Sequence, residues 1–108
     1  MTDRELLELA AKAAGLNIKS YAVDTDDAFI HLIVGRKFTS EKVAWNPLTD
    51  DGDALRLAVK LGLVVDTKPA RTYCGTTSYS SIEDHNDDPC AATRRAIVRA
   101  ASEMGKEK

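Results

Sequence analysis

The side chains best suited to catalysis or zinc binding in this 108-residue sequence are two cysteines and two histidines. Zinc sites usually take ligands paired at close spacing, as in C-x-x-C, whereas sixteen positions separate Cys74 from Cys90. His85 precedes Cys90 by five positions, and His31 stands apart within an apolar run. His85 and Cys90 are therefore the best candidates for a small enzyme or a metal-dependent site.

Cys90 is open to two interpretations. It falls in the first turn of a predicted helix, where the helix dipole favours a reactive thiolate. It also falls on the apolar stripe of that helix, where a cysteine acts as a small core residue. We favour the second interpretation and expect both cysteines to be free thiols in a reducing cytoplasm. The sequence accordingly predicts no catalytic residue and no cofactor.

Acidic residues gather in three short clusters, which are Asp24/Asp26/Asp27, Asp50/Asp51/Asp53 and Glu83/Asp84/Asp87/Asp88. Oxygen-rich loops suit magnesium or calcium, but the alternating acids and following glycine of a calcium-binding helix-loop-helix are missing. Turns and helix N-caps account for all three clusters. We therefore expect no metal site.

Contact with nucleic acid would use the basic side chains near the end of the chain, which are Arg94, Arg95, Arg99, Lys106 and Lys108. Arginines on one side of a helix can reach phosphates. However, the formal net charge is −2, no aromatic residues are interleaved, and a charged helix face is usually only solvated. We expect the three arginines to face water, and nucleic-acid contact ranks third among the functions considered.

Aromatic side chains beside turns favour binding to a protein. Tyr73 and Tyr79 belong to a weak strand rich in β-formers, which we expect at the edge of a sheet. Trp45, the only tryptophan, should be largely buried beneath the turn made by Asn46 and Pro47. Exposed aromatics and free strand edges are common contact material, so protein binding is the leading class.

The stretch from Trp45 to Gly62 organises the predicted fold. Pro47 breaks any incoming strand, Thr49 or Asp50 can cap a helix, and Gly62 suits a left-handed helix end. Apolar residues between the cap and the glycine cover most of the helix circumference. We therefore expect this helix to be the most buried one.

Helices and strands flank this stretch on both sides. A first helix begins at Thr2 or Asp3 and ends at Gly15, and a last helix begins after Asp88 with Pro89 in its first turn. The last helix has an apolar stripe consisting of Cys90, Thr93, Ile97, Ala100, Ala101 and Met104. Strands are predicted near 18–23, 29–34, 63–65 and 72–79, with a short edge strand at 38–45 and a polar loop at 80–88.

These elements predict an α+β fold in the order α-β-β-α-β-β-α. Residues 1–104 would form a single layered α/β/α domain with a small, mostly antiparallel sheet, and residues 105–108 a frayed tail. A partial repeat accompanies this order, because LELAAK at 7–12 and LRLAVK at 55–60 are each followed by glycine and leucine. The repeat indicates either a duplicated unit or the shared pattern of amphipathic helices that end at glycine.

Two runs, WNPLTDDGDALRLAVKLG at 45–62 and DPCAATRRAIVRAA at 88–101, together with the opening LLELAAKAAG, resemble a family of small phage and prophage proteins described as the phage ABA-sandwich domain. The resemblance implies a layered α/β/α fold and a bacterial host cytoplasm. It carries over no catalytic residue.

Together these patterns predict a small phage or prophage accessory protein that binds a host or phage protein, or a second copy of itself as a homodimer. A small enzyme or metal-dependent site at His85 and Cys90 is the alternative. No run of eighteen apolar residues occurs, and the chain opens into an amphipathic helix without a signal peptide. We therefore expect a cytoplasmic protein without a membrane contact.

Overall fold

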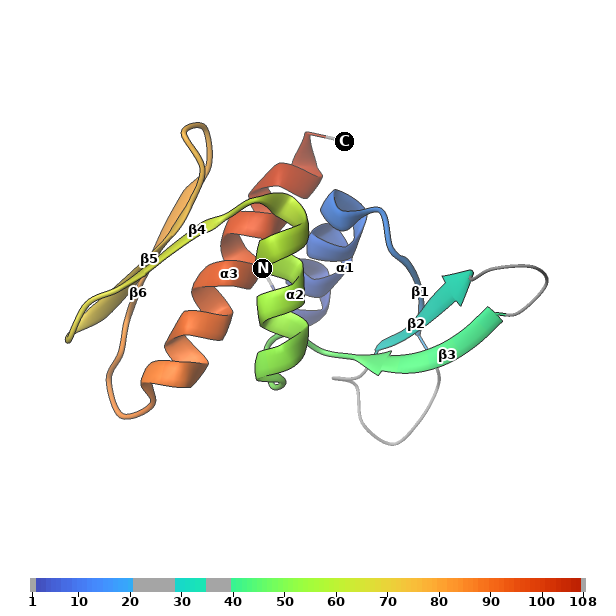
Figure 1. Cartoon of the computed structure of the whole chain (residues 1–108), viewed down its shortest axis with the longest axis horizontal. Helices are drawn as coiled ribbons and strands as arrows, with labels where there is room; N and C mark the ends of the chain where they lie inside the picture. Colours follow the sequence, from blue (N-terminus) through green and yellow to red (C-terminus); the bar gives the residue numbers. More distant parts are fainter. Residues whose placement is uncertain (1, 21–28, 35–39, 108) are drawn as a thin grey trace.

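The computed structural model of the chain describes residues 2–20, 29–34 and 40–107 (Figure 1). The elements follow the order α1 (Asp3–Ala14), β1 (Asn17–Ser20), β2 (Phe29–Val34), β3 (Ser40–Trp45), α2 (Asp51–Leu61), β4 (Val64–Thr67), β5 (Arg71–Gly75), β6 (Ser80–Asp84) and α3 (Pro89–Lys106). The predicted α+β class with antiparallel strand pairing is confirmed.

All three described helices begin at their predicted caps, and α1 and α2 end at the predicted glycines. The side chains of Thr2, Asp50 and Asp88 cap α1, α2 and α3 by accepting hydrogen bonds from backbone N–H groups three residues on, at 3.1, 2.8 and 3.0 Å. Gly15 and Gly62 terminate α1 and α2 with φ angles of 70° and 67°, in the left-handed region that glycine adopts without steric cost.

The strands form two antiparallel sheets of three, in the orders β1-β2-β3 and β4-β5-β6. The short edge strand predicted at 38–45 is present as β3, which pairs with β2 along its whole length. The polar loop predicted at 80–88 was wrong for residues 80–84, which form β6 and pair with β5. Alternating burial explains the error, because Ser81 is buried between the exposed Ser80 and Ile82 on a strand of low hydropathy.

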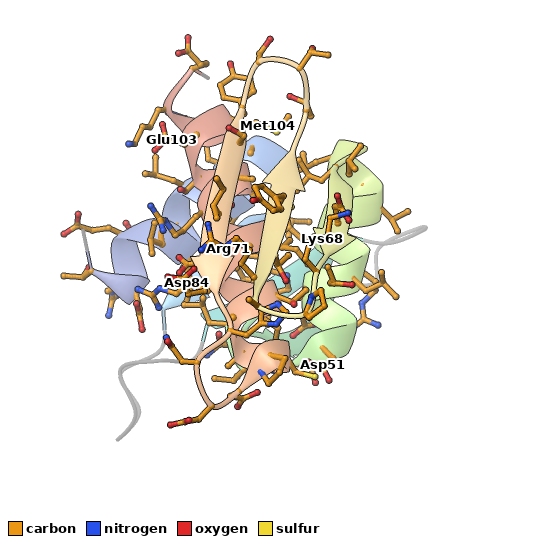
Figure 2. The ribbon with its side chains drawn as sticks, turned by 90° about the vertical axis from the view of Figure 1, so that its left-hand side faces the viewer. Asp51, Lys68, Arg71, Asp84, Glu103 and Met104 are labelled. Atoms are coloured by element: carbon orange, nitrogen blue, oxygen red, sulfur yellow. The ribbon has the colours of Figure 1, made fainter. Side chains whose placement is uncertain are left out.

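The helices lie between the two sheets, not outside a single one (Figure 1). The β4–β6 sheet packs against α3, and α1 and α2 lie on the opposite side of α3. The other face of β4–β6 is turned toward the viewer in Figure 2, where none of the described helices lies over it and Arg71 and Asp84 project from it. Helix α3 is consequently covered from both directions.

Helix α2 has the fewest buried residues of the three described helices, so the expectation that it would be the most buried was wrong. Seven residues of α3 are buried, and they are Ala96, Ile97, Val98, Ala100, Ala101, Ser102 and Gly105. Helix α2 leaves Leu55 and Val59 exposed because α3 covers only one of its sides. The prediction that Trp45 is buried is confirmed, with 6% of its surface exposed.

Gly105 allows α1 and α3 to cross at very short range. A Cβ atom added to Gly105 would lie 2.0 Å from the carbonyl oxygen of Leu9 on α1. The helix continues through Lys106, so the tail predicted to fray from residue 105 remains helical there. Two helix backbones can approach this closely only where one of them carries no side chain.

We expect the Gly105→Ala substitution to destabilise the protein by about 1–3 kcal/mol, because the two helices must separate to admit one methyl group. Gly52→Ala is the matched control within α2, where the added Cβ meets only the ends of the Arg56 and Asp50 side chains at 3.1–3.2 Å. That control should be neutral or stabilising by up to about 1 kcal/mol. Denaturant unfolding measures both, and equal midpoints for the two variants would contradict the close crossing.

Candidate functional site

An apolar groove lies between α2, the first half of α3 and strand β4, with a volume of about 640 Å³. Its lining residues are Asp51, Ala54, Leu55, Val65, Thr67, Lys68, Pro69, His85, Pro89, Cys90, Thr93, Arg94 and Ile97. Two of them, Asp51 and Lys68, are labelled in Figure 2 beside the β4–β6 sheet. Among the residues that the sequence singled out, the groove contains His85, Cys90 and Arg94.

Apolar side chains of α2, β4 and α3 form the walls of this groove, and one of them, Leu55, is largely exposed. Leu55 projects from α2 with 63% of its surface exposed, while Ala54 beside it is buried in the core. Val65 of β4 is half-buried opposite them, and Ile97 of α3 is buried. A side chain the size of leucine gains about 1.5–3 kcal/mol when it is fully removed from water, so the uncovered Leu55 favours a partner.

Arg94 fixes the distance between α3 and the start of α2. Its Nε donates to the carbonyl oxygen of Leu48 at 2.8 Å, and its Nη1 donates to Oδ1 of Asp51 at 2.5 Å. Only 16% of the Arg94 side chain is exposed. The prediction that Arg94 faces water was therefore wrong, because the Asn46-Pro47 turn brings a free carbonyl and a carboxylate to it.

His85 is buried in a chain of hydrogen bonds that ends in the groove. Its Nδ1 lies 3.2 Å from the carbonyl oxygen of Pro69, which can only accept, so Nδ1 carries the proton. With the ring neutral, Nε2 accepts from the Thr72 hydroxyl at 2.8 Å. The Thr93 hydroxyl, 2.8 Å from that of Thr72, then donates to it. The remaining lone pairs of Thr93 make this residue an acceptor in the groove.

These contacts weaken the case for a His85 and Cys90 catalytic pair. Both ring nitrogens of His85 are engaged by Pro69 and Thr72, which leaves neither to activate a thiol. Cys90 is exposed, so its assignment to the core was wrong. It is the second residue of α3, in the first turn of the helix, and none of the described elements buries it. Within the described ranges, no three His, Cys, Asp or Glu side chains are arranged to hold a metal ion.

The two remaining arginines of α3 are paired with carboxylates. Arg99 donates to Oε1 of Glu83 at 2.5 Å, and Arg95 lies 3.9 Å from the same oxygen and 3.2 Å from Oδ1 of Asp3. They project from a different side of the helix than Arg94, because the helix turns by about 100° per residue. The arginines therefore form no common face, and their charge is largely compensated within the protein.

The tyrosines predicted to bind a partner lie away from the groove. Tyr73 is 39% exposed on the outer face of β5, where it pairs across the sheet with Ile82. Tyr79 is half-buried in the turn before β6 and lines a separate polar hollow. Leu55 and Val65 were not predicted as site residues. The signal for Leu55 was the apolar circumference of α2, which exceeds what one neighbouring helix can cover.

The acidic residues of the second cluster serve the helix start, as the sequence predicts. Asp50 caps α2, Asp51 pairs with Arg94, and Asp53 is buried. The Asp53 carboxylate accepts from the backbone N–H of Asn46 at 2.9 Å and from Arg56 at 2.7 Å. These contacts clamp the turn before α2. The cluster at Asp24, Asp26 and Asp27 and the His31 side chain lie outside the described structure.

Comparison of the chain with protein-family models, curated proteins and solved structures finds no match. In the described part of the chain, no helix is both long enough and apolar enough to cross a membrane.

The Thr72→Val substitution should destabilise the protein by about 1–3 kcal/mol, because it keeps the shape of a fully buried side chain while removing the hydroxyl that His85 and Thr93 share. Thr67→Val, on the exposed neighbouring strand, is the control and should change stability by less than about 0.5 kcal/mol. Thermal unfolding compares the two. A Thr72→Val protein as stable as the control would argue against the hydrogen-bond chain.

The two thiols should differ sharply in reactivity. Burial raises the pKa of Cys74 to about 11 from 9.0, whereas Cys90 is exposed. An alkylating reagent near neutral pH should modify Cys90 rapidly and Cys74 only on unfolding, and Cys90→Ser should remove the rapid phase. Because unfolding releases the Cys74 thiolate, stability should also decline as the pH rises from about 9 toward 11. Rapid labelling of Cys74 in the Cys90→Ser protein would contradict its burial beneath α3.

Proposed function

We propose that the protein is a binding module whose groove takes an apolar segment of a host or phage protein. The observation that carries the proposal is the exposed apolar wall of α2 beside that groove. Leu55 and Val59 are 63% and 72% exposed, one helical turn apart. Val59 lies outside the groove lining, so the apolar surface continues past the groove itself. A surface of that extent suits a macromolecular partner better than a small molecule.

The partial repeat in the sequence supports this proposal. Leu7 and Ala11 of α1 occupy the positions that correspond to Leu55 and Val59 of α2, and each is only 1% exposed. Helix α1 is covered within the molecule, where it packs against α3. The matching face of α2 has no such cover within the described structure. A second molecule that covered it would remove the same kind of surface from water.

The alternative functions have less support. An enzyme at His85 and Cys90 lacks a free ring nitrogen, and the three arginines of α3 expected to contact nucleic acid are each paired with a carboxylate. The phage or prophage origin and the cytoplasmic location rest on the family resemblance and remain part of the proposal. A homodimer is a further arrangement that the same apolar surface would allow.

Affinity capture from a bacterial lysate tests the proposal, with the purified protein as bait, with and without nuclease, and with mass spectrometry as the readout. Leu55→Asp should abolish capture, because the complex loses about 1.5–3 kcal/mol of free energy from burying the leucine side chain and must also bury a carboxylate. Ile82→Asp is the control, since Ile82 is 50% exposed on the outer face of the sheet, away from the groove.

The expected result is a protein that survives nuclease, is retained by the wild type and by Ile82→Asp, and is lost with Leu55→Asp. The proposal would be overturned if the Leu55→Asp protein captured the same partner as the wild type, or if nuclease treatment abolished capture. Size-exclusion chromatography of the bait alone distinguishes binding to a second copy from binding to another protein.

A further inference from the structure

We propose that the occupant of the groove is an extended, uncharged peptide segment that adds to the free edge of β4 as a fourth strand. This inference rests on the proposed function, because it specifies the partner of the same groove. It is carried by the hydrogen-bonding pattern of β4, which lies at the edge of its sheet and forms one wall of the groove.

The register of the β4–β5 hairpin shows which backbone groups of β4 are free. Lys68 N donates to Arg71 O at 2.8 Å, which makes these two residues a hydrogen-bonded pair. Hydrogen-bonded pairs alternate with non-bonded ones along an antiparallel ladder. Asp66 opposite Tyr73 is then the next bonded pair, whereas Val65 and Thr67 face Cys74 and Thr72 without backbone bonds to them.

Val65 and Thr67 therefore direct their N–H and C=O groups away from β5. Both residues line the groove, so these two donors and two acceptors lie along its wall. No hydrogen bond from the described residues reaches them outside the strand ladder. An extended segment placed beside β4 would pair with all four groups, as strands do when they add to a sheet edge.

This requirement distinguishes an extended segment from a helix. A helix satisfies its own backbone groups internally, so a helix laid in the groove would cover the four β4 groups and leave them unpaired. An added strand would pair them and still present side chains to the apolar surface. Because side chains alternate along a strand, every second residue of the segment would face Leu55 and Ile97.

Charge in the groove indicates an uncharged occupant. Arg94 is neutralised by Asp51, and Lys68 pairs with Asp66 at 3.4 Å. The groove also presents the Thr93 hydroxyl, which a hydroxyl or amide group in the segment would match.

Two displayed peptide libraries test the proposal with the full chain as target. One alternates apolar residues with Ser, Thr, Asn and Gln, as an extended strand requires, and the other places apolar residues at helical spacing. The strand library should yield binders. Binders from the helical library alone would overturn strand addition and leave the proposed function standing, whereas no binder from either library would overturn both.

Substitutions on β4 then test the hydrogen bonds of a selected peptide. Thr67→Pro removes an outward N–H that the sheet does not use, so the fold should persist, which thermal unfolding checks. Binding should weaken about tenfold or more, while Ile82→Asp, on the outer face of the sheet away from the groove, should bind like the wild type. Leu55→Asp should abolish binding. Loss with Leu55→Asp but not with Thr67→Pro would overturn strand addition alone, and loss with neither would overturn the proposed function too.

Amide hydrogen exchange provides a second measurement that needs no substitution. In the free protein the amides of Val65 and Thr67 should exchange rapidly, while the amide of Asp66 is protected by its partner Tyr73. Saturation with the selected peptide should slow exchange at Val65 and Thr67 and leave Asp66 nearly unchanged. Unchanged exchange at Val65 and Thr67 would overturn the proposal even if Thr67→Pro failed to fold.

Discussion

The close crossing of α1 and α3 is the contact on which the other elements depend. Ala10 of α1 and Ala100 and Ala101 of α3 have no exposed surface, and Gly105 carries no side chain where it meets Leu9. Small residues let the two helix axes approach closely, which gives α3 a fixed position in the middle of the molecule. The β4–β6 sheet can then pack on one side of α3 while α2 packs on another, and the groove is what remains between them.

Arginines of α3 complete this anchoring from both flanks of the helix. Arg94 ties α3 to the turn before α2 and to Asp51, and Arg99 ties it to Glu83 on β6. Such largely screened or half-buried ion pairs contribute little net stability, because desolvation offsets most of the attraction. Their effect is geometric, since Arg94 can satisfy Leu48 and Asp51 together only at one separation of the two helices. The width of the groove near the start of α2 follows from that separation.

Local chemistry predicted the helices well because their signals are local. Asp50 starts α2 through a capping hydrogen bond, and Gly62 ends it through a left-handed backbone conformation. Both effects depend on only a few neighbouring residues. The burial of each helix was less predictable. An apolar circumference shows that a helix can be buried on all sides, but it does not show that other elements of the same chain pack against every side. The same limit applies to His85, whose partners Pro69 and Thr72 come from the β4–β5 turn and from β5. No sequence spacing encodes those contacts.

The two halves of the chain share the same local structure, a helix that ends at glycine and is followed by a sheet, but they differ in how their helices are packed. Leu16 N donates to Ala11 O and Leu63 N donates to Ala58 O, each at 2.9 Å, so α1 and α2 finish in the same hydrogen-bonded turn. Each helix then leads into a three-stranded antiparallel sheet.

The third helix breaks the equivalence of these two halves. Two units of helix and sheet would each need a covering helix, but α3 is a single element, and its small-residue face is matched to α1. Helix α2 receives only another side of α3, which leaves the Leu55 side uncovered beside the free edge of β4. The exposed apolar face of α2 and the free edge of β4 thus have a common cause, because α3 can pack its small-residue face against only one of the two other described helices. The groove forms where α2 lacks such a covering helix.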